Sequence, residues 1–179
     1  MELNLIYAIS EQNIFSSNES IPWKCSDDMQ HFKNTTLNSI IIMGRKTYES
    51  LPSSLSNGFI NRFNIVISSN IFQLNNENLL FLNSINDALK YIEINLKDKY
   101  KKIFIIGGIN LFKSIFNNKK LFNKIDNVYE SVIKNFKVDL DSLNNYLLFP
   151  NDFKKKLDYN FYNLEYDYGT FILKKYFKP

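Results

Sequence analysis

The 179-residue sequence contains one cysteine, Cys25, and one histidine, His31. A single cysteine excludes an internal disulfide framework and any zinc or iron–sulfur site built from several cysteines. A single histidine excludes a histidine-rich metal site and argues against Ser-His-Asp or Cys-His catalysis. We therefore expect no metal centre and no catalytic triad.

Long apolar runs are also missing. No stretch reaches the roughly 18 apolar residues that a membrane-spanning helix needs. The N-terminal residues Met-Glu-Leu-Asn-Leu-Ile-Tyr-Ala lack the basic start and the small-residue cleavage site of a secretory signal. The sequence therefore predicts a cytoplasmic protein that does not bind membranes.

Arginine is scarce, because only Arg45 and Arg62 stand among the 22 basic residues. A guanidinium group binds phosphate or carboxylate through two parallel hydrogen bonds, which lysine cannot imitate. Both arginines are thus candidates for anion binding. The alternative is that the two arginines have no such role and remain by chance in a lysine-rich chain. The net charge of +4 comes from scattered lysines. This scatter favours a solvated surface over a nucleic-acid-binding one.

Hydrophobic residues make up 45% of the chain, enough for one domain over residues 1–179 with a buried core. Short β-rich runs alternate with helical stretches, and a C-terminal hairpin follows them. This order predicts an α/β fold with a mostly parallel sheet and an antiparallel C-terminal edge strand. The expected strands are 3–9, 39–43, 63–68, 79–82, 102–106, 128–133, 161–166 and 170–176, and the expected helices are 26–37, 45–51, 84–96 and 109–116. Ser26 and Ser84 are the expected helix N-caps, and residues 11–22 are expected to form a polar loop.

Two strand-to-helix junctions carry glycine, namely residues 42–47 with Gly44 and residues 105–110 with Gly107 and Gly108. In open α/β sheets, ligands bind beyond the carboxyl ends of the strands, where helix N-termini attract phosphate. Glycine lets backbone N–H groups approach such a ligand closely. Arg45 and its neighbours Lys46 and Thr47 add charge and a hydroxyl, so the first junction is a candidate anion site. Neither junction has a GxGxxG or Walker sequence.

A carboxylate, Asp28, occupies an otherwise apolar face of the helix expected over residues 26–37. Asp28, Phe32 and Thr36 recur every four residues and therefore share one side of the helix, to which Met29 also adds apolar surface. Such a carboxylate must be paired, have a raised pKa, or bind a ligand rich in hydrogen-bond donors. The alternative role for Asp28 is to stabilise the helix dipole.

Taken in order, these segments resemble the dihydrofolate reductase family. The resemblance rests on Ile21-Pro22-Trp23 with Asp28 and Phe32 beyond it, on residues 42–50, on residues 61–68 and on Ile106-Gly107-Gly108. It covers nearly the whole chain. It implies a single domain with a central eight-stranded, mostly parallel sheet flanked by four helices. It also implies reduction of 7,8-dihydrofolate to tetrahydrofolate by NADPH.

The resemblance further implies individual roles. Asp28 matches the pocket carboxylate that binds the pterin ring, Arg62 matches the arginine that holds the substrate's carboxylate, and Trp23 and Ser131 join Asp28 in the catalytic set. The implied substrate-binding residues are Ile6, Asp28, Met29, Phe32, Arg62, Ile106 and Ser131. The implied cofactor-binding residues are Ala8, Phe15, Gly44, Arg45, Lys46, Thr47, Ser68, Ser69, Gly107, Gly108, Ile109, Asn110 and Leu111. A cis Gly107–Gly108 peptide and a lid over residues 11–23 are also implied.

The sequence departs from the family where Phe15-Ser16 replaces a common glycine position in the lid. Two alternatives stay open: a pyrimidine reductase of the riboflavin pathway, which shares the fold and NADPH, and a folate- or nucleotide-binding protein without turnover. The implied ligands besides NADPH are dihydrofolate and methotrexate-like antifolates. A monomer and a fusion with thymidylate synthase are both compatible with the sequence.

Overall fold

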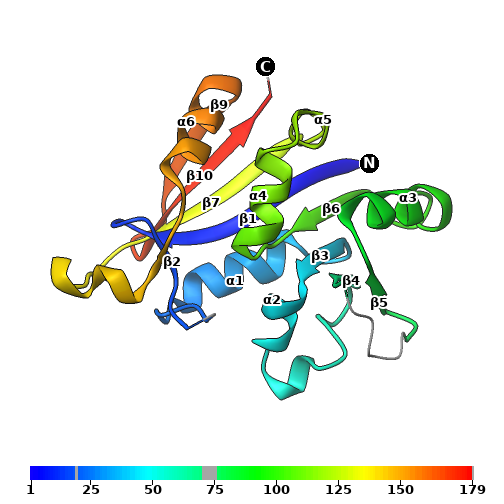
Figure 1. Ribbon diagram of the computed structural model, residues 1–179, viewed down its shortest axis with the longest axis horizontal. Helices are drawn as coiled ribbons and strands as arrows, with labels where there is room; N and C mark the ends of the chain where they lie inside the picture. The colour runs from blue at the N-terminus through cyan, green and yellow to red at the C-terminus, as the bar shows by residue number, and fades with distance from the viewer. Residues whose placement is uncertain (19, 70–75, 179) are drawn as a thin grey trace.

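Eight strands form the central sheet of the computed structural model, which describes residues 1–18, 20–69 and 76–178. Their order is β5-β4-β3-β6-β1-β7-β10-β9 (Figure 1). The first six strands in this order run parallel, β10 runs antiparallel to β7, and β9 runs antiparallel to β10. The strands are β1 (Glu2–Ser10), β3 (Ile40–Gly44), β4 (Phe63–Ile67), β5 (Leu79–Leu82), β6 (Lys102–Ile105), β7 (Asn127–Ile133), β9 (Tyr162–Asp167) and β10 (Phe171–Phe177). The predicted sheet is confirmed.

The four expected helices are present, and two more accompany them in the described part of the chain. The helices are α1 (Ser26–Thr35), α2 (Arg45–Glu49), α3 (Ile85–Asn95), α4 (Ile109–Phe116), α5 (Lys119–Phe122) and α6 (Asn151–Asn160), with 3-10 turns at Ser53–Leu55 and Leu140–Asn145. Helix α6 escaped prediction because only Phe153 and Leu157 of its ten residues are buried. One such pair is too short a repeat to indicate a helix.

The two faces of the sheet carry different helices. Leu5, Tyr7 and Ile9 of β1 pack into a core that includes buried residues of α3, α4 and α6. Ile6, on the opposite side of the same strand, packs with Tyr48 of α2 and with neighbouring strands. This alternation follows from the two-residue period of a strand. It places helices on both faces, as a mostly parallel sheet requires.

The helix ends agree only partly with the predicted caps. Ser84 caps α3, because its hydroxyl accepts a hydrogen bond from the Asp87 backbone N–H at 3.1 Å. The expectation for Ser26 was wrong, since Cys25 is the N-cap of α1 and makes no capping hydrogen bond. Helix α1 also ends two residues early, at Thr35. Asn38 then takes a left-handed conformation, with φ of 54°, that ends the helical path.

The segment expected to be a polar loop contains a short strand. β2 (Ile14–Ser16) pairs antiparallel with β8 (Leu147–Leu148) in a separate two-stranded sheet. The Gln12 side chain extends this contact, since it donates to the Val138 carbonyl at 2.9 Å and accepts from the Val138 N–H at 2.8 Å. The lid segment is therefore attached to residues 138–148, which are distant in sequence.

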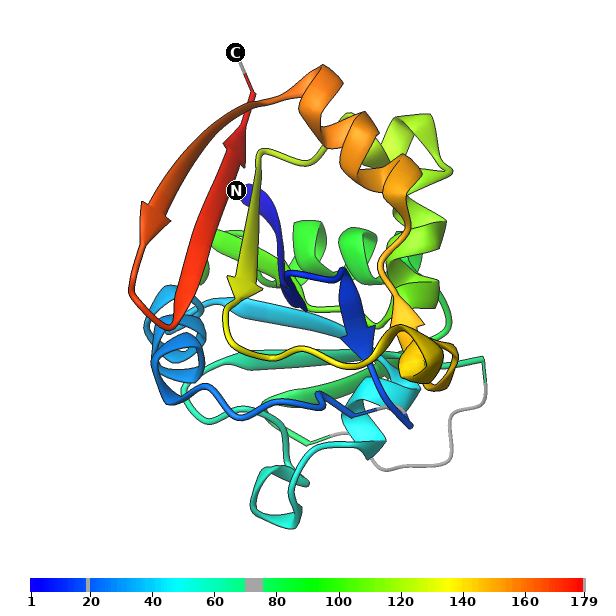
Figure 2. The same ribbon diagram turned by 90° about the vertical axis from the view of Figure 1, so that its left-hand side faces the viewer.

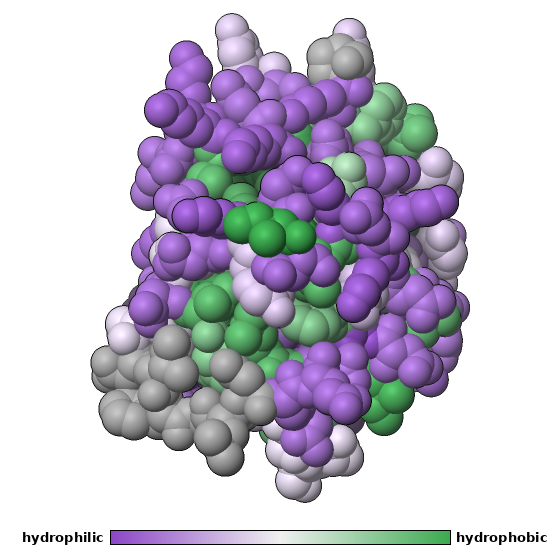
Figure 3. Space-filling view, turned by 90° about the vertical axis from the view of Figure 1, so that its right-hand side faces the viewer, coloured by the Kyte–Doolittle hydropathy of each residue, from purple (hydrophilic) through white to green (hydrophobic). Residues whose placement is uncertain are grey.

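The surface on the side of α3 is mostly hydrophilic, and hydrophobic residues gather there only in small separate areas (Figure 3). Among the described residues, no helix combines the length and the apolar character needed to cross a bilayer.

Candidate active site

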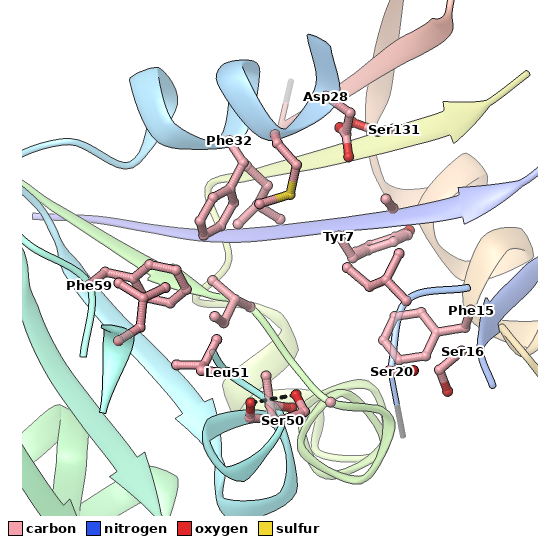
Figure 4. A pocket seen from close by; sticks show the side chains of 18 of the residues that line it. Tyr7, Phe15, Ser16, Ser20, Asp28, Phe32, Ser50, Leu51, Phe59 and Ser131 are labelled. Atoms are coloured by element: carbon pink, nitrogen blue, oxygen red, sulfur yellow. Dashed lines mark hydrogen bonds between the residues drawn. The ribbon is translucent and has the colours of Figure 1, made fainter. Parts of the chain in front are cut away.

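A cleft of about 430 Å³ opens at the carboxyl ends of the central strands, under α1. Its lining is mostly apolar. Figure 4 shows Asp28 beside Ser131, with Phe32 and Phe59 to one side and Tyr7 and Phe15 to the other. The predicted residues that line this cleft are Ile6, Ala8, Phe15, Asp28, Met29, Phe32, Thr47, Ile106, Gly108 and Ser131.

Asp28 is the one acidic residue among those that line this cleft, and the residue is 8% exposed. It projects from the first turn of α1 toward β7, where Ser131 stands beside Ala8 of β1. Burial raises the pKa of the Asp28 carboxyl, while a hydrogen bond from Ser131 opposes part of that rise. The arrangement agrees with the predicted buried carboxylate on an apolar helix face. Such a group favours ligands that carry N–H donors or positive charge.

Two aromatic rings form one wall of the cleft. Phe32 of α1 and Phe59 lie with ring centroids 5.4 Å apart. Phe59 is fixed by Asn64, whose Oδ1 accepts from the Phe59 N–H at 2.9 Å and whose Nδ2 donates to the Phe59 carbonyl at 3.0 Å. Gly58 precedes this contact with φ of +83°, and a Cβ there would lie 2.5 Å from Asn64 Cγ. Only glycine fits at this position.

A second cleft, of about 600 Å³, lies beside the first and contains both glycine junctions. The Gly44 N–H donates to the Gly107 carbonyl at 2.7 Å, which joins the two junctions. The Gly107–Gly108 peptide is cis, as predicted. A Cβ on Gly108 would lie 3.1 Å from Thr47 Oγ1, so the two segments pack closely. The predicted residues that line this cleft are Phe15, Gly44, Arg45, Lys46, Thr47, Ser68, Ser69, Gly108, Ile109, Asn110 and Leu111.

Arg45 stands at the first residue of α2 and forms an ion pair with Glu49 one turn later, at 2.9 Å. Both side chains are about half exposed, so the pair is weak and can yield to a better anion. Helices α2 and α4 begin at this cleft with glycines as their N-caps. Backbone N–H groups at such starts carry partial positive charge. The cleft is therefore suited to an elongated ligand with phosphate groups.

The two clefts adjoin, since Phe15, Ser16, Thr47 and Gly108 line both of them. Ala8, predicted to contact the cofactor, lines the first cleft and not the second. Ligands in the two clefts would meet at the shared wall.

Three predicted site residues, Trp23, Arg62 and Gly107, line neither cleft. Trp23 packs edge-on against Phe136, with ring centroids 5.5 Å apart, and lines a separate surface hollow. Arg62 is buried, and its guanidinium carbon lies 5.9 Å from the centroid of the ring of Phe59, which lines the first cleft. Gly107 is absent from both linings but joins the two junctions through its carbonyl. The roles of these three residues stay predictions.

Several lining residues went unpredicted. In the first cleft they are Tyr7, Ser16, Ser20, Ile21, Ser50, Leu51, Pro52, Leu55 and Phe59. In the second they are Ser16, Ile67, Asn83, Ser84, Ile85, Ser114 and Leu147. Most come from loops or strand ends that carry no motif. Ile21, Ser50 and Ile67 stand in the segments that carry the family resemblance. Ser84 had a signal of another kind, because an N-cap at a strand-to-helix junction marks the same edge of the sheet.

The fold and the two adjoining clefts are those of an α/β protein that binds ligands beyond the carboxyl ends of parallel strands. A family model described as dihydrofolate reductase matches residues 2–164. The chain therefore belongs to the dihydrofolate reductase family.

Individual relatives agree with this assignment. The chain is 35% identical to the dihydrofolate reductase of Buchnera aphidicola subsp. Acyrthosiphon pisum over 128 residues, which cover 70% of this chain and 73% of the relative. It is 32% identical to the type 9 dihydrofolate reductase of Escherichia coli over 115 residues, or 63% of each chain. A solved structure of dihydrofolate reductase from Enterococcus faecalis, complexed with NADP(H) and RAB-propyl, shares the fold with a TM-score of 0.68. That comparison covers 99% of this chain and 96% of the other at 23% identity.

Proposed function

We propose that the chain reduces 7,8-dihydrofolate to 5,6,7,8-tetrahydrofolate with NADPH. A hydride passes to pterin C6, a proton adds at N5, and NADP⁺ is released. The observation that carries this proposal is the buried carboxylate of Asp28 in an apolar cleft that shares a wall with a glycine-lined cleft. Family membership supports the same reaction.

The second cleft fits NADPH. Both glycine junctions line it, so a diphosphate there would lie close to backbone N–H groups, and the helix starts favour negative charge. Arg45, with Ser68 and Ser69, would bind the 2′-phosphate that separates NADPH from NADH. When bound, the nicotinamide supplies the hydride, and this chain's residues orient the ring and exclude water from it.

The first cleft fits a pterin. The Asp28 carboxylate accepts hydrogen bonds from the N3 and 2-amino groups of the ring, while Phe32 and Phe59 provide apolar contact. A buried anion favours the protonated pterin, and a dry pocket strengthens that attraction. We infer that water delivers the proton to N5, because Asp28 would face the N3 side of the ring. Ser131 acts as a positioning residue by donating a hydrogen bond to Asp28.

Arg62 is suited to the carboxylate tail of the substrate. It donates to Thr36 Oγ1 at 3.0 Å and to the carbonyls of Ile60 and Lys33 at 2.6 Å each. In the described ranges no acidic side chain pairs with it, and burial lowers the pKa of its guanidinium group. A buried cation held only by neutral acceptors is stabilised by an anionic ligand.

An assay of NADPH oxidation with dihydrofolate tests the proposal. We expect turnover by the wild-type chain and a loss of at least about 100-fold for Asp28→Asn near pH 7. The control is Asp27→Asn, since Asp27 lies outside both clefts and its Oδ2 accepts from the Thr170 hydroxyl. Near-normal activity of Asp28→Asn would contradict the assignment.

The alternatives give distinct results in the same experiment. Tight methotrexate binding without NADPH oxidation would indicate a binding protein. Activity on an aminopyrimidine with a ribityl phosphate, without activity on dihydrofolate, would indicate the riboflavin-pathway reductase. A cytoplasmic location, and a monomeric or fused state, stay predictions.

A further inference from the structure

The outermost strand of the sheet, β9, has an open edge. It pairs on one side with β10, and in the described residues no strand pairs with its other side (Figure 2). All six of its residues are exposed. A strand in this position presents outward-pointing backbone N–H and C=O groups that can pair with another strand.

β9 lacks the features that usually prevent such pairing. Its sequence, Tyr-Asn-Leu-Glu-Tyr-Asp, contains no lysine and no proline, and its register with β10 has no bulge. Its two carboxylates are already neutralised within the chain. Lys174 lies 2.7 Å from Glu165, and Lys134 lies 2.7 Å from Asp167. The edge therefore carries little net charge to repel an identical edge.

The side chains of β9 divide into an apolar and a polar face. Tyr162, Leu164 and Tyr166 project to one side, with exposed fractions of 62%, 49% and 45%. Tyr166 is opposite Leu173, and Leu173 is opposite Ser131, so this is the side of the sheet that faces α1. Asn163, Glu165 and Asp167 project to the other side.

We propose that β9 pairs antiparallel with β9 of a second copy of this chain about a two-fold axis. A register centred on Leu164 places Leu164 against its own copy, Tyr162 against Tyr166, and Asn163 against Glu165. The apolar faces then join into one aromatic ladder, and no two carboxylates are opposed. A register centred on Glu165 would oppose two carboxylates, and a one-residue shift would mix the two faces.

The expected dimer is reversible. One pair of six-residue strands with their side chains makes a small interface compared with those of permanent dimers. We therefore expect a dimer dissociation constant in the range of about 1–100 μM.

Sedimentation velocity on the full chain, from about 1 to 200 μM, tests the proposal across that range. We expect the wild type to shift from monomer to dimer, and Leu164→Lys to remain a monomer because two lysines would face each other at the axis. The matched control is Ile94→Lys, since Ile94 is 67% exposed on α3 and lies at a distance from β9. It should dimerise like the wild type. Circular dichroism verifies that both variants fold.

Three results would overturn the proposal: a wild type that stays monomeric throughout, a Leu164→Lys variant that dimerises normally, or an Ile94→Lys variant that does not dimerise. Hydrogen exchange of the wild type gives a test that needs no variant. The β9 amides should exchange at least about threefold more slowly at the highest concentration than at the lowest, in line with a mostly dimeric population. Equal exchange at both concentrations would also overturn the proposal.

Discussion

The most unusual buried group outside the clefts is Glu130 on β7. It is fully buried, accepts from the Tyr7 hydroxyl at 2.9 Å, and has Lys154 Nζ 3.6 Å from its other oxygen. That other oxygen has no hydrogen-bond partner in the described ranges. Burial raises the pKa of the Glu130 carboxyl, although Lys154, the Tyr7 hydroxyl and Lys174 oppose the rise.

This raised pKa predicts how stability changes with pH. A carboxyl whose pKa is higher in the folded than in the unfolded state binds its proton more tightly when folded. The stability it contributes is complete below the unfolded pKa of about 4.3 and is lost as the pH rises through the folded pKa. Glu130→Gln removes this dependence. The free energy of unfolding of the variant, relative to that of the wild type, should therefore increase as the pH rises.

Urea unfolding at several pH values between about 4 and 8 measures this difference. Glu93→Gln is the control, since the Glu93 side chain is 74% exposed. It should follow the wild type at every pH. A constant difference between Glu130→Gln and the wild type would contradict the prediction.

Arg62 gives a prediction about substrate binding. We expect Arg62→Lys to raise the KM for dihydrofolate by about 10- to 100-fold, because lysine cannot make the two parallel bonds to a carboxylate. A truncated pterin without the glutamate tail should show little change. Equal losses on both substrates would indicate that Arg62 acts only through the backbone carbonyls of Ile60 and Lys33.

At the scale of elements, Gly58 determines where Phe59 lies in the first cleft. We expect Gly58→Ala to lower the free energy of unfolding by about 1–3 kcal/mol and to raise the KM for dihydrofolate, because the new Cβ would collide with Asn64. Gly169→Ala is a matched control. Gly169 has φ of +82°, but a Cβ there meets nothing within 4 Å.

Comparing the two variants by urea unfolding and by steady-state kinetics separates backbone strain from the collision. The strain is common to both positions, whereas the effect on KM should appear only in Gly58→Ala. An unchanged KM in that variant would show that Phe59 is placed by other contacts.

The strands of the sheet could be predicted from sequence because parallel strands buried on both faces appear as continuous apolar runs. Ile40–Gly44 is such a strand, with four fully buried residues before the glycine. β2 and β8 could not be predicted in this way. They are three and two residues long, and they form only because distant segments meet.

The same distinction applies to the candidate site. Asp28 and the glycine junctions have local signals, namely a helical repeat and two strand-to-helix turns. Phe59 has none, because its position depends on the Asn64 side chain of a neighbouring strand. Trp23 stands in a sequence motif, yet its ring packs against Phe136, which no local pattern indicated.

At the scale of the whole molecule, cofactor binding should stabilise the fold. A ligand that binds only the folded state adds about 2.7 kcal/mol when its concentration is 100 times its dissociation constant. We therefore expect NADPH to raise the thermal midpoint, and NADH at the same concentration to raise it less. Arg45→Ala should reduce the difference between the two cofactors, as thermal denaturation with each would measure. Identical shifts with NADPH and NADH in the wild type would contradict the role of Arg45.

The wall that Phe15, Thr47 and Gly108 contribute to both clefts has a thermodynamic consequence. If a ligand in one cleft moves the Phe15 ring, it changes the affinity of the other cleft for its own ligand. By thermodynamic linkage, the second ligand changes the affinity for the first by the same factor. We therefore expect antifolate affinity to depend on cofactor occupancy. A substitution at this shared wall that lowers the affinity for an antifolate should therefore also change the affinity for NADPH.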